Sequence, residues 1–136
     1  MGEARKVARR FYDSFASGDF EAAGECFADT CVTVTPMGEL DKAQHEAFGR
    51  SFKSGLPDAR MDIVRAVEAD DQVFVNGRFR GTHTADLVSP DGTLAATGNA
   101  VDLAFSDYFR VQDGRIVAHV IIWDQMAMLA QLGALR

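Results

Sequence analysis

The hydrophobic residues of this chain recur first at the spacing of helices and later at the spacing of strands. An apolar residue at every fourth position from Val7 to Phe15 predicts an amphipathic helix over about residues 3–16. Asp19 can accept the free amide hydrogens of a first helical turn, so a second, shorter helix is expected over residues 20–27.

Two more helices are expected further along the chain. Asp41 is placed to cap a third helix, which carries Phe48 and Phe52 and which Gly55-Leu56-Pro57 terminates. A fourth helix is expected over residues 125–132, directly after Asp124.

Strand patterns fill most of the remaining sequence. β-Branched and aromatic residues dominate five segments, which Gly, Pro and Asp separate. Asp113-Gly114 favours a hairpin between the last two segments, and another turn is expected at Ser89-Pro90-Asp91-Gly92. The five predicted strands are residues 31–35, 60–68, 72–83, 97–112 and 115–123.

The last predicted strand is hydrophobic on both faces, which indicates that it lies inside its sheet. Because side chains alternate along a strand, its residues form two sets that point to opposite faces, one ending in Ile122 and the other in Trp123. The first set is Ile116, Ala118, Val120 and Ile122, and the second is Val117, His119, Ile121 and Trp123. Because helices can cover only one face, the other is expected to form a homodimer interface.

Helices followed by a long antiparallel meander predict an α+β fold, with the helices on one face of the sheet. The length of 136 residues fits one domain, residues 1–136. A net charge of −6 argues against nucleic acid as a partner. No run of apolar residues approaches the ~18 of a membrane-spanning helix, and the N-terminus lacks a signal-peptide core. No membrane partner and a cytoplasmic location are therefore expected, with Cys26 and Cys31 as reduced thiols.

Polar residues on otherwise apolar strand faces are the candidates for chemistry. Asp107 interrupts one such face, and His83 follows another. Because burying an unpaired carboxylate is costly, Asp107 is expected either to line a cavity that admits a polar ligand or to be satisfied by backbone amides. His119 is expected either to line the pocket or to pack against a carbonyl, whereas His45 is expected to be solvated.

The function predicted from these residues is acid–base chemistry in an apolar pocket, without a cofactor. No histidine pair has ligand spacing with a carboxylate, so no metal site is expected, and no phosphate loop or serine triad is present. His83 and Asp107 are expected to project into one cavity. Its walls, which would bind the substrate, are predicted to be Phe11, Phe15, Val73, Phe79, Phe105 and Phe109, with Trp123 able to stack on a flat ligand.

Asp124 has two competing interpretations. It stands where the last strand ends and a helix begins, so its side chain can cap that helix. A carboxylate at the rim of an apolar sheet can also exchange protons with a substrate.

Four segments share their order and spacing with a known family. They are FASGDF at residues 15–20, RGTH at 80–83, DYFRVQDGRI at 107–116 and WDQMAMLAQLG at 123–133. Together they resemble the SnoaL-like polyketide cyclases over nearly the whole chain. The resemblance implies the cone-shaped α+β fold shared with ketosteroid isomerase and nuclear transport factor two. In that fold, helices and a curved, mostly antiparallel sheet enclose an apolar pocket.

The resemblance also implies roles for individual residues. In those cyclases, a carboxylate after the last strand is the general acid/base of a cofactor-free aldol ring closure, and it matches Asp124. Residues 131–133 follow it as in the family, and His83 and His119 match histidines of the cyclase pattern.

Two positions depart from the cyclase pattern. Asp107 stands where these cyclases carry a pocket histidine, and Phe105 stands where they carry a glutamine. Asp107 instead resembles the oxyanion-hole acid of ketosteroid isomerase. The tyrosine and the general base of that isomerase correspond to Phe11 and Thr35, so its mechanism is not expected here. Tyr12 is rotated by about 100° from Phe11 and is expected to face elsewhere.

The expected function is a cofactor-independent acid–base enzyme of the polyketide cyclase type that acts on a small hydrophobic carbonyl compound. Asp124 would remove the proton, and protonated Asp107, His83 or His119 would stabilise the enolate. Another cofactor-free reaction, such as hydroxylation, dehydration or hydrolysis, would use the same residues. A non-catalytic binding protein is the third possibility, with Asp124 only as a cap.

Overall fold

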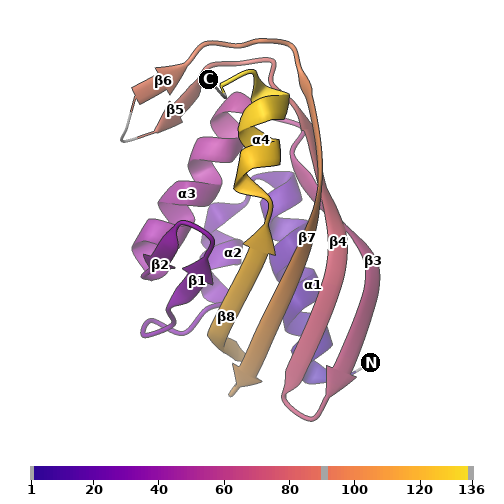
Figure 1. Ribbon diagram of the computed structural model, residues 1–136. Helices are drawn as coiled ribbons and strands as arrows, with labels where there is room; N and C mark the ends of the chain where they lie inside the picture. Colours follow the sequence, from indigo (N-terminus) through magenta and orange to yellow (C-terminus); the bar gives the residue numbers. More distant parts are fainter. Residues whose placement is uncertain (1, 90–91, 135–136) are drawn as a thin grey trace.

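The computed structural model describes residues 2–89 and 92–134. Three helices cover one face of a curved sheet, and a fourth lies beyond the end of its last strand (Figure 1). This arrangement confirms the predicted α+β fold. The helices are α1 (Glu3–Ser17), α2 (Phe20–Glu25), α3 (Lys42–Gly55) and α4 (Gln125–Leu132).

The helices begin and end where local chemistry predicted. The Asp41 carboxylate accepts a hydrogen bond from the backbone of Gln44 at 2.8 Å, and the Gln44 side chain accepts one from the Asp41 backbone at 2.9 Å. The Asp19 carboxylate caps α2 by accepting a hydrogen bond from the backbone of Ala22 at 3.0 Å. At the end of α1, Gly18 adopts a φ of 76°, a conformation that glycine reaches at little cost.

Six strands form the main sheet in the order β2-β1-β8-β7-β4-β3. All neighbours are antiparallel except β1 and β8, which run parallel. The prediction that residues 115–123 lie inside the sheet is confirmed, because β8 has a partner on each side. The strands are β1 (Thr33–Thr35), β2 (Gly38–Leu40), β3 (Arg60–Ala69), β4 (Gln72–Thr82), β7 (Ala100–Gln112) and β8 (Arg115–Trp123).

A short hairpin of β5 (Leu87–Ser89) and β6 (Gly92–Leu94) stands apart from the main sheet, close to α3 (Figure 1). The sequence patterns did not predict these two strands. The turn predicted at Ser89-Pro90-Asp91-Gly92 falls on residues 90–91, which lie outside the described part of the chain.

The alternation expected along the last strand is wrong at its start. The pairing of β7 with β8 shifts register, because Arg110 pairs with Ala118 and Val111 with Ile116. This bulge leaves Val117 as an extra residue in β8. As a result, Ile116 and His119 both face the core, although strict alternation placed them on opposite faces.

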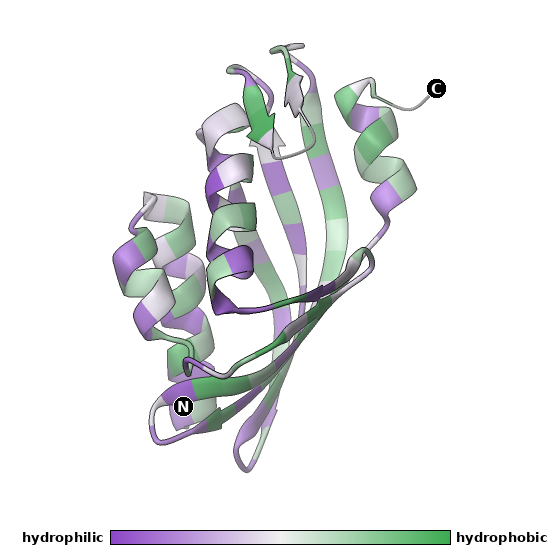
Figure 2. Cartoon of the chain, turned by 90° about the vertical axis from the view of Figure 1, so that its left-hand side faces the viewer, coloured by the Kyte–Doolittle hydropathy of each residue, from purple (hydrophilic) through white to green (hydrophobic). Residues whose placement is uncertain are grey.

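Hydrophobic and hydrophilic positions alternate in bands along the strands (Figure 2). The inward residues of β7 are buried, whereas the outward residues between them are exposed or half-buried. Gly77 of β4 lets the Phe105 ring lie against the strand, since a Cβ atom there would be 2.5 Å from both that ring and the Asp62 carbonyl oxygen. The core therefore lies between the inner sheet face and α1, α2 and α3.

The outer sheet face carries an apolar row that crosses five strands. Its members are adjacent in register, and three of them are exposed. From β3 to β1 the row is Val67, Phe74, Tyr108, Val120 and Val34. Among the described helices, none is both long and apolar enough to cross a membrane.

Candidate functional site

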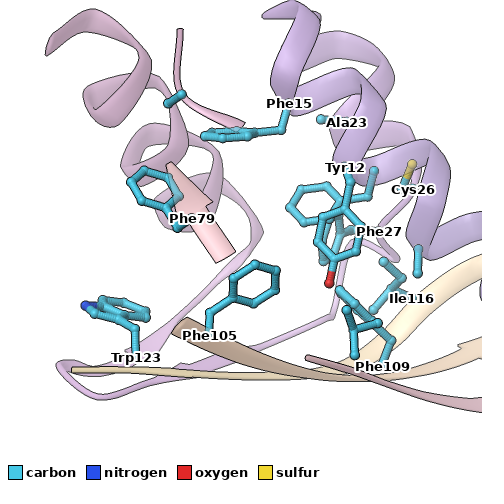
Figure 3. Close-up of a cluster of buried hydrophobic side chains, with 14 of the residues drawn as sticks. Tyr12, Phe15, Ala23, Cys26, Phe27, Phe79, Phe105, Phe109, Ile116 and Trp123 are labelled. Atoms are coloured by element: carbon cyan, nitrogen blue, oxygen red, sulfur yellow. The ribbon is translucent and has the colours of Figure 1, made fainter. Parts of the chain in front are cut away.

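An apolar cavity of about 90 Å³ lies between the helices and the inner face of the sheet. Five of the predicted wall residues do line it: Phe11, Phe15, Phe79, Phe105 and Trp123. Figure 3 shows these aromatic rings converging from α1 and from three strands, apart from Phe11, which it does not label. Phe109 and Val73 were also expected in the wall, but they are fully buried and do not line the cavity.

A chain of four hydrogen-bonded side chains is buried beside the cavity. The Tyr12 hydroxyl donates to Oδ2 of Asp107 at 2.5 Å, and Figure 3 shows that hydroxyl pointing toward the sheet. Oδ1 of Asp107 lies 2.8 Å from Nε2 of His119. Nδ1 of His119 lies 3.0 Å from the Thr33 hydroxyl. Each of these residues is 3% exposed or less, so water does not compete for the bonds.

The hydrogen bonds fix the donors and acceptors of this chain. Burial raises the pKa of Tyr12 well above its usual value, and the neighbouring Asp107 raises it further, so Tyr12 remains a donor. With Asp107 as a carboxylate, both of its oxygens accept hydrogen bonds and Nε2 of His119 donates. Thr33 can donate to Nδ1 of a neutral His119 or accept from a protonated one, because its hydroxyl rotates.

Two expectations about this region are wrong. Asp107 does not project into the cavity, because His119 lines the wall and Asp107 lies behind it. Tyr12 does not face away from the site, because the buried stripe of α1 includes it as well as Phe11. Such a stripe is wider than 100°, so two consecutive residues can both be buried.

His45 is part of the cavity wall, although it was expected to be solvated. It is half-buried, and its ring centroid lies 5.0 Å from that of Phe27 and 5.3 Å from that of His119. The sequence contained the signal for this position, because His45 precedes Phe48 and Phe52 by three and seven residues. That spacing places all three on one face of α3.

His83 lies elsewhere in the fold. Its side chain is fully buried beyond the end of β4, and its Nδ1 lies 2.9 Å from the Thr97 hydroxyl. Nε2 has no hydrogen-bond partner within the described residues. The expectation that His83 projects into the cavity is wrong, because β4 ends beyond the cavity and carries only Phe79 into its wall.

Asp124 is exposed and does not line the cavity. Its carboxylate accepts a hydrogen bond from the backbone of Ala127 at 3.0 Å and thereby caps α4. The neighbouring Trp123 is buried in the wall, and its ring nitrogen donates to Gln125 at 2.7 Å. The geometry is therefore that of a helix cap next to the site.

Two charged residues, Lys42 and Glu46, also line the cavity. Nζ of Lys42 donates to the Phe27 carbonyl oxygen at 3.0 Å and to the Asp29 carboxylate at 3.1 Å. The Glu46 carboxylate accepts a hydrogen bond from Arg50 at 3.2 Å. Among residues 2–89 and 92–134, no cluster of three His, Cys, Asp or Glu side chains could hold a metal ion.

Comparisons with known proteins agree with this architecture. The sequence model of the SnoaL-like polyketide cyclase family matches residues 6–132. IdmH from Streptomyces antibioticus, provisionally described as a polyketide cyclase, superposes with a TM-score of 0.81 at 27% identity, over 97% of this chain and 99% of IdmH. No curated protein matches the sequence.

Two more distant structures share the fold alone. AclR from Streptomyces galilaeus, provisionally described as a hydroxylase, has a TM-score of 0.84 at 17% identity, over 98% of both chains. A protein of ketosteroid isomerase-like fold from Catenulispora acidiphila, solved with trimethylamine, has a TM-score of 0.74 at 15% identity, over 96% of this chain and 93% of its own. Since the family match spans nearly the whole sequence, the chain belongs to the SnoaL-like polyketide cyclase family.

Proposed function

We propose that this protein is a cofactor-independent acid–base enzyme that acts on a small hydrophobic carbonyl compound, in the manner of a polyketide cyclase. The observation that carries the proposal is the buried chain Tyr12–Asp107–His119, which ends at the wall of an otherwise apolar cavity. Family membership and the likeness to IdmH support the same reaction class.

In the proposed reaction, His119 removes a proton next to the substrate carbonyl. Asp107 holds the imidazole through Nε2 and stabilises the positive charge that forms on it. The Thr33 hydroxyl turns away from Nδ1, which then accepts the proton. The resulting enolate carbon attacks a second carbonyl of the same molecule, and the proton returns to the new alkoxide. Ring closure therefore needs no external reactant.

Asp124 is the alternative general base, as the resemblance to the cyclases implies. For that role it must release its bond to Ala127 and turn toward the cavity beside Trp123. Asn at position 124 still accepts the capping hydrogen bond but cannot exchange a proton. The substitution D124N therefore distinguishes the two roles, because it keeps the helix cap and removes the general base.

The test follows proton removal itself and needs no knowledge of the natural substrate. Exchange of the α-protons of phenylacetone in D₂O is measured by NMR for wild type, H119Q, D107N and D124N, with melting temperatures measured alongside. We expect H119Q and D107N to slow the enzymatic exchange by at least ~10²-fold and D124N to leave it unchanged. Loss of exchange in a well-folded D124N, with H119Q unaffected, would instead identify Asp124 as the base.

A non-catalytic binding protein is the second candidate. It is favoured by the engagement of both His119 nitrogens, which leaves neither free for a substrate in the structure. In that case, wild type binds phenylacetone without accelerating its exchange.

A further inference from the structure

His45 differs in hydrogen bonding from the other titratable side chains around the cavity. The side chains of His119, Lys42 and Glu46 each form at least one hydrogen bond with another protein group. Within the part of the chain that the structure describes, the His45 imidazole has no hydrogen-bond partner, although it lines the cavity.

The setting of His45 keeps its ring uncharged. Burial and, to a smaller extent, the neighbouring His119 together lower the pKa of His45 to about 3. His45 is also the fourth residue of α3, close to the positive end of the helix dipole, which disfavours a cation. The charged groups that line the cavity with it are Lys42 and Glu46, which carry opposite charges.

A neutral imidazole offers one acceptor nitrogen and one N–H donor. The rings of Phe11 and Phe27 pack beside it, with centroids 5.7 and 5.0 Å from that of His45. A polar atom of a bound ligand would supply a hydrogen bond that no described protein group makes to this ring. In a low-dielectric wall, such a bond discriminates between ligands of equal shape.

We propose that His45 is the polar anchor of the cavity and accepts a hydrogen bond from a ligand hydroxyl. The ligand class is an apolar ring or chain that carries a phenol or enol O–H. The inference rests on the proposed function only in taking this cavity as the ligand site.

The test compares two probes of nearly equal shape, phenol and toluene, of which only phenol has a hydroxyl. Dissociation constants are measured by NMR titration for wild type and for H45F, which keeps an aromatic ring but removes both nitrogens. One neutral hydrogen bond predicts that H45F weakens phenol binding about three- to tenfold and changes toluene binding less than twofold. F48L serves as the matched control, because Phe48 lines the same cavity without a polar atom, so it should affect both probes alike.

The proposal that His45 anchors the ligand is refuted if H45F weakens the binding of both probes equally, or if neither probe binds to wild type. If H45F does not fold, ¹⁵N shifts of the wild-type His45 ring replace it, and only phenol should move the acceptor nitrogen. A ring that responds equally to both probes contradicts the proposal. Selective phenol binding without any α-proton exchange would leave the anchor supported while refuting the proposed catalysis.

Discussion

The carboxyl group of Asp107 is held by the Tyr12 hydroxyl and the His119 ring, and within the described structure no Lys or Arg side chain bonds to it. Tyr12 occupies one of its oxygens and His119 the other, so the burial cost of the carboxyl is offset by two hydrogen bonds. The expected alternative was satisfaction by backbone amides, but side chains from α1 and β8 supply the partners. This ties the charge state of the site to the packing of two distant elements.

The unpartnered ring of His45 makes stability depend on pH. The folded pKa is about 3 and the unfolded value is about 6.5, so between these values only the unfolded chain binds the proton. The contribution of His45 is therefore complete above pH 6.5 and is lost as the pH falls toward 3. The slope is at most about 1.4 kcal/mol per pH unit.

We expect the free energy of unfolding of wild type to fall between pH 7 and pH 5 by about 1–2 kcal/mol more than that of H45F. Urea denaturation of both proteins at the two pH values measures this difference. Parallel losses in the two proteins would show that His45 does not contribute.

Residue positions were predictable where one element alone decides them. Alternation along β7 placed Asp107 on the buried face, and the cap position identified Asp124. Tyr12 and His45 were missed because the width of a helix stripe was underestimated, not because the signal was absent. His83 was misplaced for another reason: alternation gives the buried face of a strand but not which part of that face borders the cavity.

At the scale of the elements, the close approach of β4 to its neighbours is set by one small residue. A methyl group on Gly77 would meet the carbonyl oxygen of Asp62, which cannot move without shifting β3, and the ring of Phe105. We expect G77A to lower the free energy of unfolding by about 1–3 kcal/mol through overpacking. Chemical denaturation measures the change.

The control for this substitution is G24A in α2. A Cβ atom there meets nothing nearer than 3.4 Å, and alanine favours the helix, so stability should stay level or rise. Equal free energies of unfolding for G77A and wild type would contradict this prediction, because they would show that β3 and β4 accommodate the methyl group without loss of stability.

The boundaries of the helices and the longer strands were predicted well, because caps and turns depend on neighbouring residues. The pairing of the strands was not predicted. Nothing near residues 33–35 specifies a parallel partner at residues 119–120, because that contact joins segments far apart in the sequence. The bulge at Val117 likewise depends on how β7 and β8 fit together. These features arise from packing between elements rather than within them.

At the scale of the whole molecule, the outer sheet face remains uncovered. Phe74 and Val67 are exposed to 52% and 61%, and the apolar row that contains them crosses the sheet. We propose that this face forms a homodimer, since a specific interface buries about 1,200 Å² or more in total. Sedimentation should show a dimer at micromolar concentration for wild type and a monomer for F74E.

V88E is the matched control for the dimer. Val88 is exposed to a similar degree, 54%, but lies on the β5–β6 hairpin away from this face. Its substitution should leave the dimer intact. A monomeric wild type would contradict the proposal.

The parallel pairing of β1 with β8 also constrains how the protein is made. On a ribosome, residues 33–35 emerge long before residue 115, the start of their partner strand, has been translated. At synthesis rates of about 5–20 residues per second, the 79 residues between Thr35 and Arg115 take roughly 4–16 s. Throughout that interval residues 33–35 have no β8 to pair with, and Thr33 has no His119 to bond. The buried chain of hydrogen bonds through Tyr12, Asp107, His119 and Thr33 thus assembles only after residue 119 has been translated, so a chain that terminates before this residue lacks it.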